Sequence, residues 1–287
     1  MNKQKIINLA EEEFAASRLN SFAALGYPQE KIWEKVDTGF AAGDDPLFAF
    51  FKEDIGAFYW SPSQAFNQVY LGANIPDRDL SVLSIGFYMG KILKEKQRAQ
   101  TDEPSMCWMY SRNSWEPFVE DFSRRFVDRL AKEGVRVAAI DLAPGFSWQE
   151  SKKYGKASNW SQRHTAYVAG LGTFGLCDGL ISRNGKAARY SSFIIEGRYE
   201  PDPRLYNGPH DWCLYYKNGT CGVCVKLCPV GAISDHGHDK DICADFTRKM
   251  AVKYKSEPAL QPGRAGWCGL CQGAVPCQNG VPKGILD

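Results

Sequence analysis

The stretch from residue 213 to residue 233, CLYYKNGTCGVCVKLCPVGAI, holds four cysteines at spacings that suit a metal site. A common iron–sulfur motif has the spacing C-x2-C-x2-C-x3-C-P. Cys221, Cys224, Cys228 and Pro229 match its last three cysteines and its proline, whereas Asn218 stands where the first cysteine belongs. The stretch therefore predicts either an incomplete cluster site or a site whose missing ligand comes from elsewhere in the chain.

Eight of the ten cysteines lie after residue 212, and clustering of this kind indicates metal binding. In two-cluster ferredoxins the cysteine before the proline ligates the other cluster. The same arrangement predicts one [4Fe–4S] cluster here with the ligands Cys213, Cys221, Cys224 and Cys277. It predicts a second [4Fe–4S] cluster with the ligands Cys228, Cys243, Cys268 and Cys271. Cys213 then replaces the ligand missing at Asn218, because the Asn-Gly pair in the intervening loop favours a turn.

Zinc is the main alternative to iron–sulfur clusters. The C-x2-C pairs at 221–224 and 268–271 have the spacing of a four-cysteine zinc site. Zinc there leaves the other four cysteines of the segment without a role, and a single cluster is a further alternative. Cys107 and Cys177 fall outside the layout, and we interpret them as buried or cofactor-lining thiols rather than ligands. His210, His236 and His238 are interpreted as solvated loop residues.

The residues before the cysteines must form the core that positions them. Apolar residues at helical spacing predict a largely helical N-terminus and helices at 28–36, 45–58, 116–133 and 161–169. Short apolar runs with β-branched residues predict buried strands at 80–90, 135–144 and 188–197. The aromatic segment 106–118 is interpreted as a loop that either lines a pocket or packs in the core. This order of elements predicts an α+β or α/β fold.

We predict three parts in the chain: a helical segment (1–75), an α/β core (76–205) and a metal-organised module (206–287). The formal net charge of +2 gives no strong signal for nucleic acid or for a membrane surface. The N-terminus lacks the apolar run of a signal peptide, and no apolar stretch reaches the length of a membrane span. These features predict a soluble cytoplasmic protein.

Two segments of the predicted core resemble a known family. AIDLAP (139–144) and WSQRHTAYVAGLGTFGLCDGLIS (160–182), followed by the two cysteine groups, resemble epoxyqueuosine reductases and the catalytic core of reductive dehalogenases over residues 75–285. Both are cobalamin-dependent reductases with two [4Fe–4S] clusters. The resemblance implies a nitroreductase-like cobalamin-binding core with a C-terminal two-cluster ferredoxin-like module. It also implies base-off cobalamin, which agrees with the lack of a D-x-H-x-x-G motif.

The resemblance assigns roles to individual residues. Asp141 matches the family's proton donor, and it follows a predicted buried strand, although an Asp before Pro144 could equally cap a turn. Cofactor contacts are implied for Arg163, His164, Gly170, Gly172, Thr173, Gly175, Asp178 and Arg189. From the residues alone, the glycines could equally end a helix and pack tightly, and a lone histidine is more often structural.

Three departures from the family pattern indicate a divergent, short member. Asn218 interrupts the first cysteine run, GLGTFGLCDGL lacks the family's Trp-Ile-Gly-Lys, and the chain ends at Asp287 without the helical repeats that many members carry. The leading hypothesis is a reductase whose clusters generate Co(I), acting on epoxyqueuosine in tRNA or on a small molecule. One alternative is a dehalogenase-like enzyme, and another is an electron-transfer protein serving a corrinoid partner. The electron donor would be a ferredoxin or flavodoxin.

Overall fold

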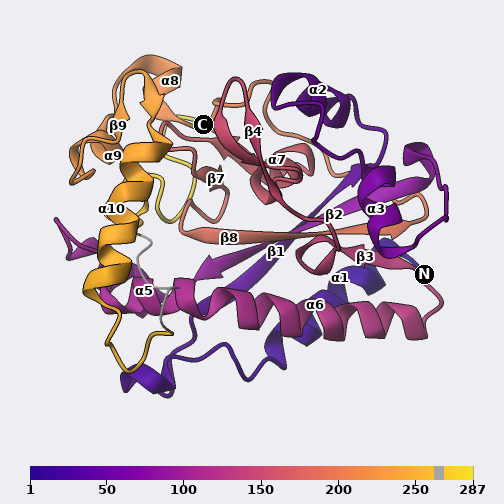
Figure 1. Ribbon diagram of the computed structural model, residues 1–287, viewed down its shortest axis with the longest axis horizontal. Coiled ribbons are helices and arrows are strands. Elements are labelled where there is room, and N and C mark those ends of the chain that lie inside the picture. The colour runs from indigo at the N-terminus through magenta and orange to yellow at the C-terminus, as the bar shows by residue number, and fades with distance from the viewer. Residues whose placement is uncertain (262–267, 287) are drawn as a thin grey trace.

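A four-stranded antiparallel sheet forms the centre of the protein (Figure 1). The computed structural model describes residues 1–261 and 268–286. The strand order is β1 (Trp33–Ala42), β2 (Leu80–Met89), β8 (Ala188–Glu196) and β3 (Val137–Ala139). Leu80 of β2 pairs with Glu196 of β8, and Val137 of β3 pairs with Ile195 of β8. Every neighbouring pair is antiparallel, so the fold is α+β.

Both faces of the sheet are covered, because successive side chains of a strand point to opposite faces. In β2, Val82 packs with the helices α2 (Pro46–Asp54), α3 (Pro62–Val69) and α7 (Gln162–Val168). Leu83 and Ile85 face the other side, where α1 (Lys3–Ala15) and α6 (Trp115–Lys132) lie. Figure 1 shows the two groups of helices on opposite sides of the sheet. All ten residues of β2 are buried, as expected for a central strand.

The remaining elements lie around this core. The helices are α4 (Lys91–Arg98), α5 (Met106–Asn113), α8 (Leu214–Asn218), α9 (Val223–Lys226) and α10 (Lys240–Lys253). The hairpins are β4 (Trp148–Ser151) with β5 (Gly155–Ser158), β6 (Gly172–Phe174) with β7 (Leu180–Ser182), and β9 (Ile233–Ser234) with β10 (Gly237–His238). Single 3-10 turns are η1 (Ala23–Leu25), η2 (Asp77–Asp79), η3 (Ile140–Leu142) and η4 (Leu270–Gln272). Among the described residues, no helix combines the length and apolarity needed to cross a membrane.

The predicted strands at 80–90 and 188–197 and the helix at 116–133 are confirmed. The helix predicted at 28–36 is wrong, because β1 begins at Trp33 and pairs with β2 along its whole length. The predicted helical segment 1–75 therefore contributes an edge strand to the sheet. The strand at 135–144 is shorter than predicted, since the chain turns into η3 at Ile140. The segment 106–118 is helical rather than a loop, and Trp108 and Trp115 are both buried in the core.

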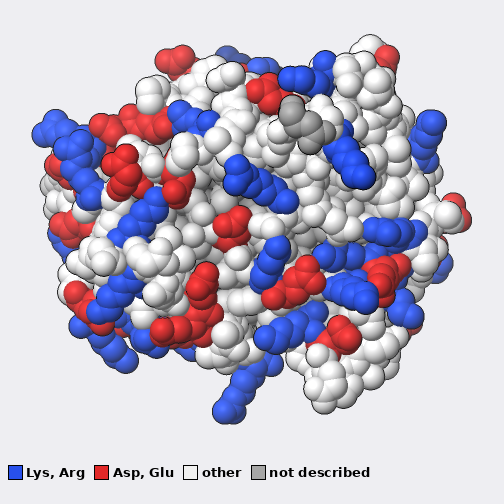
Figure 2. Space-filling model, turned by 180° about the vertical axis from the view of Figure 1, so that it is seen from behind, with Lys and Arg blue, Asp and Glu red and all other residues white. Residues whose placement is uncertain are grey.

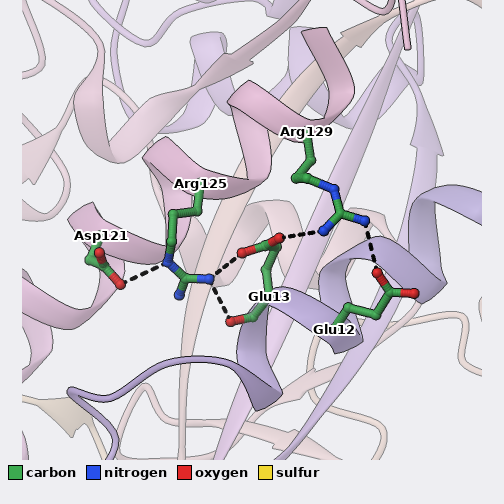
Figure 3. A network of polar contacts seen from close by, with 5 residues as sticks. All are labelled: Glu12, Glu13, Asp121, Arg125 and Arg129. Atoms are coloured by element: carbon green, nitrogen blue, oxygen red, sulfur yellow. Dashed lines mark hydrogen bonds and ion pairs between the residues drawn. The ribbon is translucent and has the colours of Figure 1, made fainter. Parts of the chain in front are cut away.

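A network of ion pairs joins α1 to α6 (Figure 3). Glu13 of α1 is only 7 % exposed, and its carboxylate contacts Arg125 and Arg129 of α6. Arg125 also donates to the main-chain oxygen of Glu13 at 3.0 Å. Arg129 extends the network to the exposed Glu12 at 2.9 Å, and Asp121 pairs with Arg125 at 3.0 Å. The network thus fixes the position of α1 against the helix that covers one face of the sheet.

Replacing Glu13 should destabilise the fold far more than replacing Glu12. Glu13→Ala leaves Arg125 with only the more exposed Asp121 as a carboxylate partner, and removing one member of a buried pair costs about 3 kcal/mol. Glu12→Ala removes an exposed pair and should cost less than about 1 kcal/mol. Urea unfolding of the two variants measures the difference. Equal losses of unfolding free energy in the two variants would show that the buried ion pair contributes no more to stability than the exposed one.

Candidate functional site

The first predicted set of thiols surrounds one pocket. The pocket lining includes Cys213, Cys221, Cys224 and Cys277. Cys213 precedes α8, and Gly219 ends that helix with a φ of 71°, so the chain reverses direction between Cys213 and Cys221. Asn218 is exposed, and its side-chain oxygen accepts hydrogen bonds from the N–H and hydroxyl of Thr220. The residue at the pocket is therefore Cys213, and Asn218 serves the turn.

The second predicted set comes from three separate elements. Cys228 follows α9, Cys243 lies in α10, and Cys268 and Cys271 lie at the η4 turn. Burial raises the pKa of Cys268 to about 12, with smaller contributions from the neighbouring thiols of Cys243 and Cys228. These three thiols are thus close to one another. Among the residues that the structure describes, no three His, Cys, Asp or Glu side chains converge on one point as a single metal ion requires.

His238 and Asp178 form a polar contact beside the second set. Nδ1 of His238 lies 3.1 Å from Oδ2 of Asp178. Asp178 and then Cys243 raise the pKa of His238 to about 10. The interpretation of His238 as a solvated residue is therefore wrong, because it connects the β6–β7 hairpin to the start of α10. Arg163 donates to the main-chain oxygen of Asp178 at 2.5 Å, so both predicted cofactor contacts take part in this local structure.

The core holds the second set through α4 and α5. Gln97 of α4 donates from Nε2 to the main-chain oxygen of Cys268 at 2.9 Å. Trp108 of α5 covers Gly269, which has a φ of 61°. An ideal Cβ at Gly269 would lie 1.9 Å from Cε2 of Trp108. The C-x2-C turn at 268–271 is therefore shaped against the core and not only by a ligand.

Gly269→Ala should disrupt this contact. Gly231, in the other cysteine run, also has positive φ, at 66°, but an added Cβ there meets nothing within 4 Å. Both substitutions carry the same backbone strain, so their difference isolates the clash with Trp108. We expect Gly269→Ala to lose about 2 kcal/mol more unfolding free energy than Gly231→Ala, measured by urea unfolding. Similar losses in the two variants would contradict packing of Trp108 on the turn.

Asp141 lies in η3, directly after strand β3, with both carboxylate oxygens hydrogen-bonded. Nε2 of Gln162 donates to Oδ1 at 3.1 Å, and the hydroxyl of Ser191 donates to Oδ2. Gln162 is held in turn by the hydroxyl of Ser192 at 2.6 Å, which accepts from Nε1 of Trp160 at 2.8 Å. Strand β8 and helix α7 thus orient this carboxyl group from two sides.

Burial raises the pKa of Asp141 to about 6. The hydrogen bonds from Ser191 and Gln162 oppose this rise, and the nearby Glu116 adds to it. A carboxylic acid that loses its proton near pH 6 can donate a proton at physiological pH. The placement predicted for Asp141, at the end of a buried strand, is confirmed.

Arg189 lies on strand β8, two residues before Ser191, the hydrogen-bond partner of Asp141, and it has an unused hydrogen-bond donor. Its Nε is buried and has no hydrogen-bond partner in the described part of the chain. The guanidinium lies over the ring of Trp115, 5.7 Å from the ring centre. Burial lowers the pKa of Arg189 to about 9, and the charge of Arg112 lowers it as well, whereas Glu116 raises it. A buried donor of this kind is suited to a polar atom of a ligand.

Other predicted cofactor contacts are occupied within the protein. His164 lies between Phe51 and Phe174, with Nδ1 2.7 Å from the hydroxyl of Ser161, and burial lowers its pKa to about 4. The hydroxyl of Thr173 accepts from the backbone N–H of Trp212 at 3.0 Å. These contacts give both side chains structural roles.

The three glycines of the turn also meet protein atoms. Gly170 has a φ of 81° just after α7, and an ideal Cβ at Gly172 would lie 2.1 Å from the main-chain oxygen of Ile181. An ideal Cβ at Gly175 would lie 3.3 Å from Cδ1 of Ile181. Internal packing alone accounts for Gly170 and Gly172. Their contact with a cofactor stays a prediction.

No sequence motif predicts that Cys177 and Lys186 lie in contact. Cys177 is buried, as predicted, but it lies beside Cys224 of the first set and Cys271 of the second. Nζ of Lys186 donates to Sγ of Cys177 at 3.1 Å. These neighbouring thiols and then Lys186 lower the pKa of Cys177. Neither residue belongs to a motif, because the β6–β7 hairpin and not sequence spacing brings them together.

The whole chain aligns with solved structures of epoxyqueuosine reductases. The enzyme from Streptococcus thermophilus matches with a TM-score of 0.52 and 16 % identity, over 99 % of this chain and 68 % of that chain. A selenomethionine-labelled epoxyqueuosine reductase gives 0.51 and 16 %, over 98 % and 68 %. An epoxyqueuosine reductase with an epoxyqueuosine-modified tRNA-Tyr stem loop gives 0.50 and 14 %, over 98 % and 68 %. The chain therefore has the mixed α+β fold of epoxyqueuosine reductases, as its motifs predicted.

The other comparisons match with a lower structural similarity or over a smaller part of the chain. A reductive dehalogenase gives a TM-score of 0.47 and 15 % identity, over 99 % of this chain and 37 % of that chain, which is too low to support an argument. No family model matches the sequence. One component of the H(2):CoB-CoM heterodisulfide,ferredoxin reductase from Methanothermobacter marburgensis is 36 % identical over 75 residues. That match covers 25 % of this chain and 11 % of the length of the relative.

Proposed function

We propose that this protein is an iron–sulfur- and cobalamin-dependent reductase of the epoxyqueuosine reductase type. The observation that carries the proposal is the pocket lined by Cys213, Cys221, Cys224 and Cys277, four thiols drawn from both ends of the cysteine segment. The shared fold and the raised pKa of Asp141 support it. Each feature is expected if electrons and a proton reach one substrate.

The donor chemistry of the cysteine segment fits two [4Fe–4S] clusters. Thiolate sulfur is the usual ligand of such clusters, and eight thiols supply two complete sets. The zinc alternative pairs residues 221–224 with 268–271, but the pocket combines 221–224 with Cys213 and Cys277 instead. This combination favours the cluster assignment over zinc.

The surroundings of Asp141 fit a polar cofactor or substrate. Arg189 has a buried donor without a partner among the described residues, and the ring of Trp115 supplies an apolar surface next to it. Cobalamin, when bound, would supply a strongly reducing cobalt centre for the substrate. Arg189 would donate to an oxygen of the bound group, while Ser191 and Gln162 hold Asp141 in place for proton transfer.

The proposed substrate is an epoxide in a modified tRNA nucleoside, and a small electrophile, including an organohalide, is the alternative. A protein of the same fold was solved with a tRNA stem loop, which supports the first. Figure 2 shows Lys and Arg interspersed with Asp and Glu on one face of the molecule, a mixture that gives no preference for a polyanion. The proposed electron donor is a ferredoxin or flavodoxin.

Anaerobic reconstitution with iron, sulfide and cobalamin tests the proposal. Retained cobalamin should give the electron paramagnetic resonance signal of low-spin Co(II), together with signals of the reduced clusters. Clusters without retained cobalamin would instead support an electron-transfer protein that serves a corrinoid partner. Turnover then separates substrates, since queuosine formation in tRNA and halide release are distinct products.

Cys213→Ser should remove one cluster and leave the other. The first pocket then has three thiols, so iron and sulfide per chain should fall by about half. Cys107→Ser is the matched control, because Cys107 is a buried thiol of the core far from both sets in the sequence. It should keep full iron content. Full iron content in Cys213→Ser as well would contradict the assignment of Cys213 as a ligand.

The rate should fall as the pH rises through about 6, because only protonated Asp141 can donate. Asp141→Asn should lower kcat by roughly 100-fold or more at pH 6. Ser191→Ala removes a hydrogen bond that stabilises the carboxylate, so the pKa of Asp141 rises and the falling limb moves to higher pH. Rates of the pre-reduced enzyme between pH 5 and 8 measure both effects. If the fall in rate occurs at the same pH in Ser191→Ala as in the unaltered protein, a group other than Asp141 controls it.

A further inference from the structure

A buried lysine lies close to thiols of both predicted sets and has no carboxylate partner among the described residues. Lys186 is 3 % exposed, and its Nζ donates to Sγ of Cys177 at 3.1 Å. Cys224 and Cys277 of the first set and Cys271 of the second lie close enough to affect its charge. No Asp or Glu within the described ranges forms an ion pair with it. Its surroundings are therefore thiols from both sets.

A buried ammonium without compensating negative charge is strongly unfavourable. In the described part of the chain, the groups that affect the charge of Lys186 are thiols, including two that line the same pocket. Two clusters held by thiolates would supply negative charge on both sides of the lysine. The position of Lys186 is thus explained by an anionic site and not by the apolar core.

The chain is shaped to hold Lys186 in this place. Its backbone N–H donates to the main-chain oxygen of Cys277 at 2.8 Å, which fixes it to a proposed ligand. An ideal Cβ at Gly179 would lie 2.7 Å from Cδ of Lys186, so the glycine leaves room for the lysine stem. Cys177 lies beside both Cys224 and Cys271 and accepts the hydrogen bond from the ammonium.

We propose that Lys186 is a fixed cation that raises the reduction potentials of both clusters, and that Cys177 positions its ammonium next to thiols of both sets without being a ligand. This inference rests on the proposed function, because it requires the clusters. A cluster held by either set would gain one negative charge on accepting an electron from the donor. A nearby positive charge in a low-dielectric interior stabilises that reduced state. Net charge and hydrogen bonds near the sulfurs are known determinants of cluster potential.

Potentiometric titration of the reconstituted protein, followed by electron paramagnetic resonance, tests the proposal. Lys186→Met should make the potentials of both clusters more negative, and Lys186→Arg should keep them near those of the unaltered protein. Lys226→Met is the matched control, because Lys226 lies in the same cysteine run but is exposed, where solvent screens its charge. Its potentials should stay almost unchanged.

The outcomes separate this inference from the proposed function. If the unaltered protein forms no clusters, the proposed function fails. If clusters form and Lys186→Met leaves both potentials unchanged, the role of Lys186 is wrong, even if that variant is less stable. Cys177→Ala should keep full iron content, because Cys177 is assigned as a positioning residue. Loss of about half the iron in that variant would instead make Cys177 a ligand.

Discussion

The hydrogen bond from the backbone N–H of Lys186 to the main-chain oxygen of Cys277 connects the segment before the central sheet strand β8 to the C-terminal cysteine segment. Lys186 lies two residues before β8, and Cys277 is one of the last proposed ligands along the chain. The cysteine segment is rich in Gly, Pro and Cys, so it cannot form an apolar core of its own. Contacts from Gln97 and Trp108 act in the same way on the 268–271 turn. Contacts with core residues therefore help to fix the positions of cysteines in both sets.

The elements with the strongest periodic patterns could be predicted from the sequence. Helix α6 places Phe118, Phe122 and Phe126 on one face, and β2 is apolar along most of its length. Strand β1 could not be predicted, because it is an edge strand in which Glu34 and Lys35 are exposed and the residues from Val36 to Thr38 are only partly buried. Its identity depends on pairing with β2, and such tertiary pairing overrides local preference.

The cysteines and Asp141 could be named as candidates from the sequence, but their geometry and several of their partners could not. Spacing identified the eight thiols and pointed to Cys213 as a substitute for a cysteine at position 218. The carboxyl of Asp141 was placed at the end of a strand, yet its partners Gln162 and Ser191 come from a helix and a strand with no motif. Long-range contacts of this kind leave no local trace in a single sequence. For the same reason Cys177 was interpreted only as a buried thiol.

One physical constraint connects the two halves of the site: a buried positive group requires a partner. The neighbours of the Lys186 ammonium are thiols, and burying the ammonium among them is unfavourable unless the thiols carry negative charge. Arg189 meets this constraint only in part, since Glu116 is near but Nε has no acceptor among the described residues. Lys186 lies in the cysteine pocket, and Arg189 lies two residues before Ser191, the hydrogen-bond partner of Asp141. Strand β8 begins two residues after Lys186 and contains Arg189, so one short segment links the proposed electron path to the proposed proton donor.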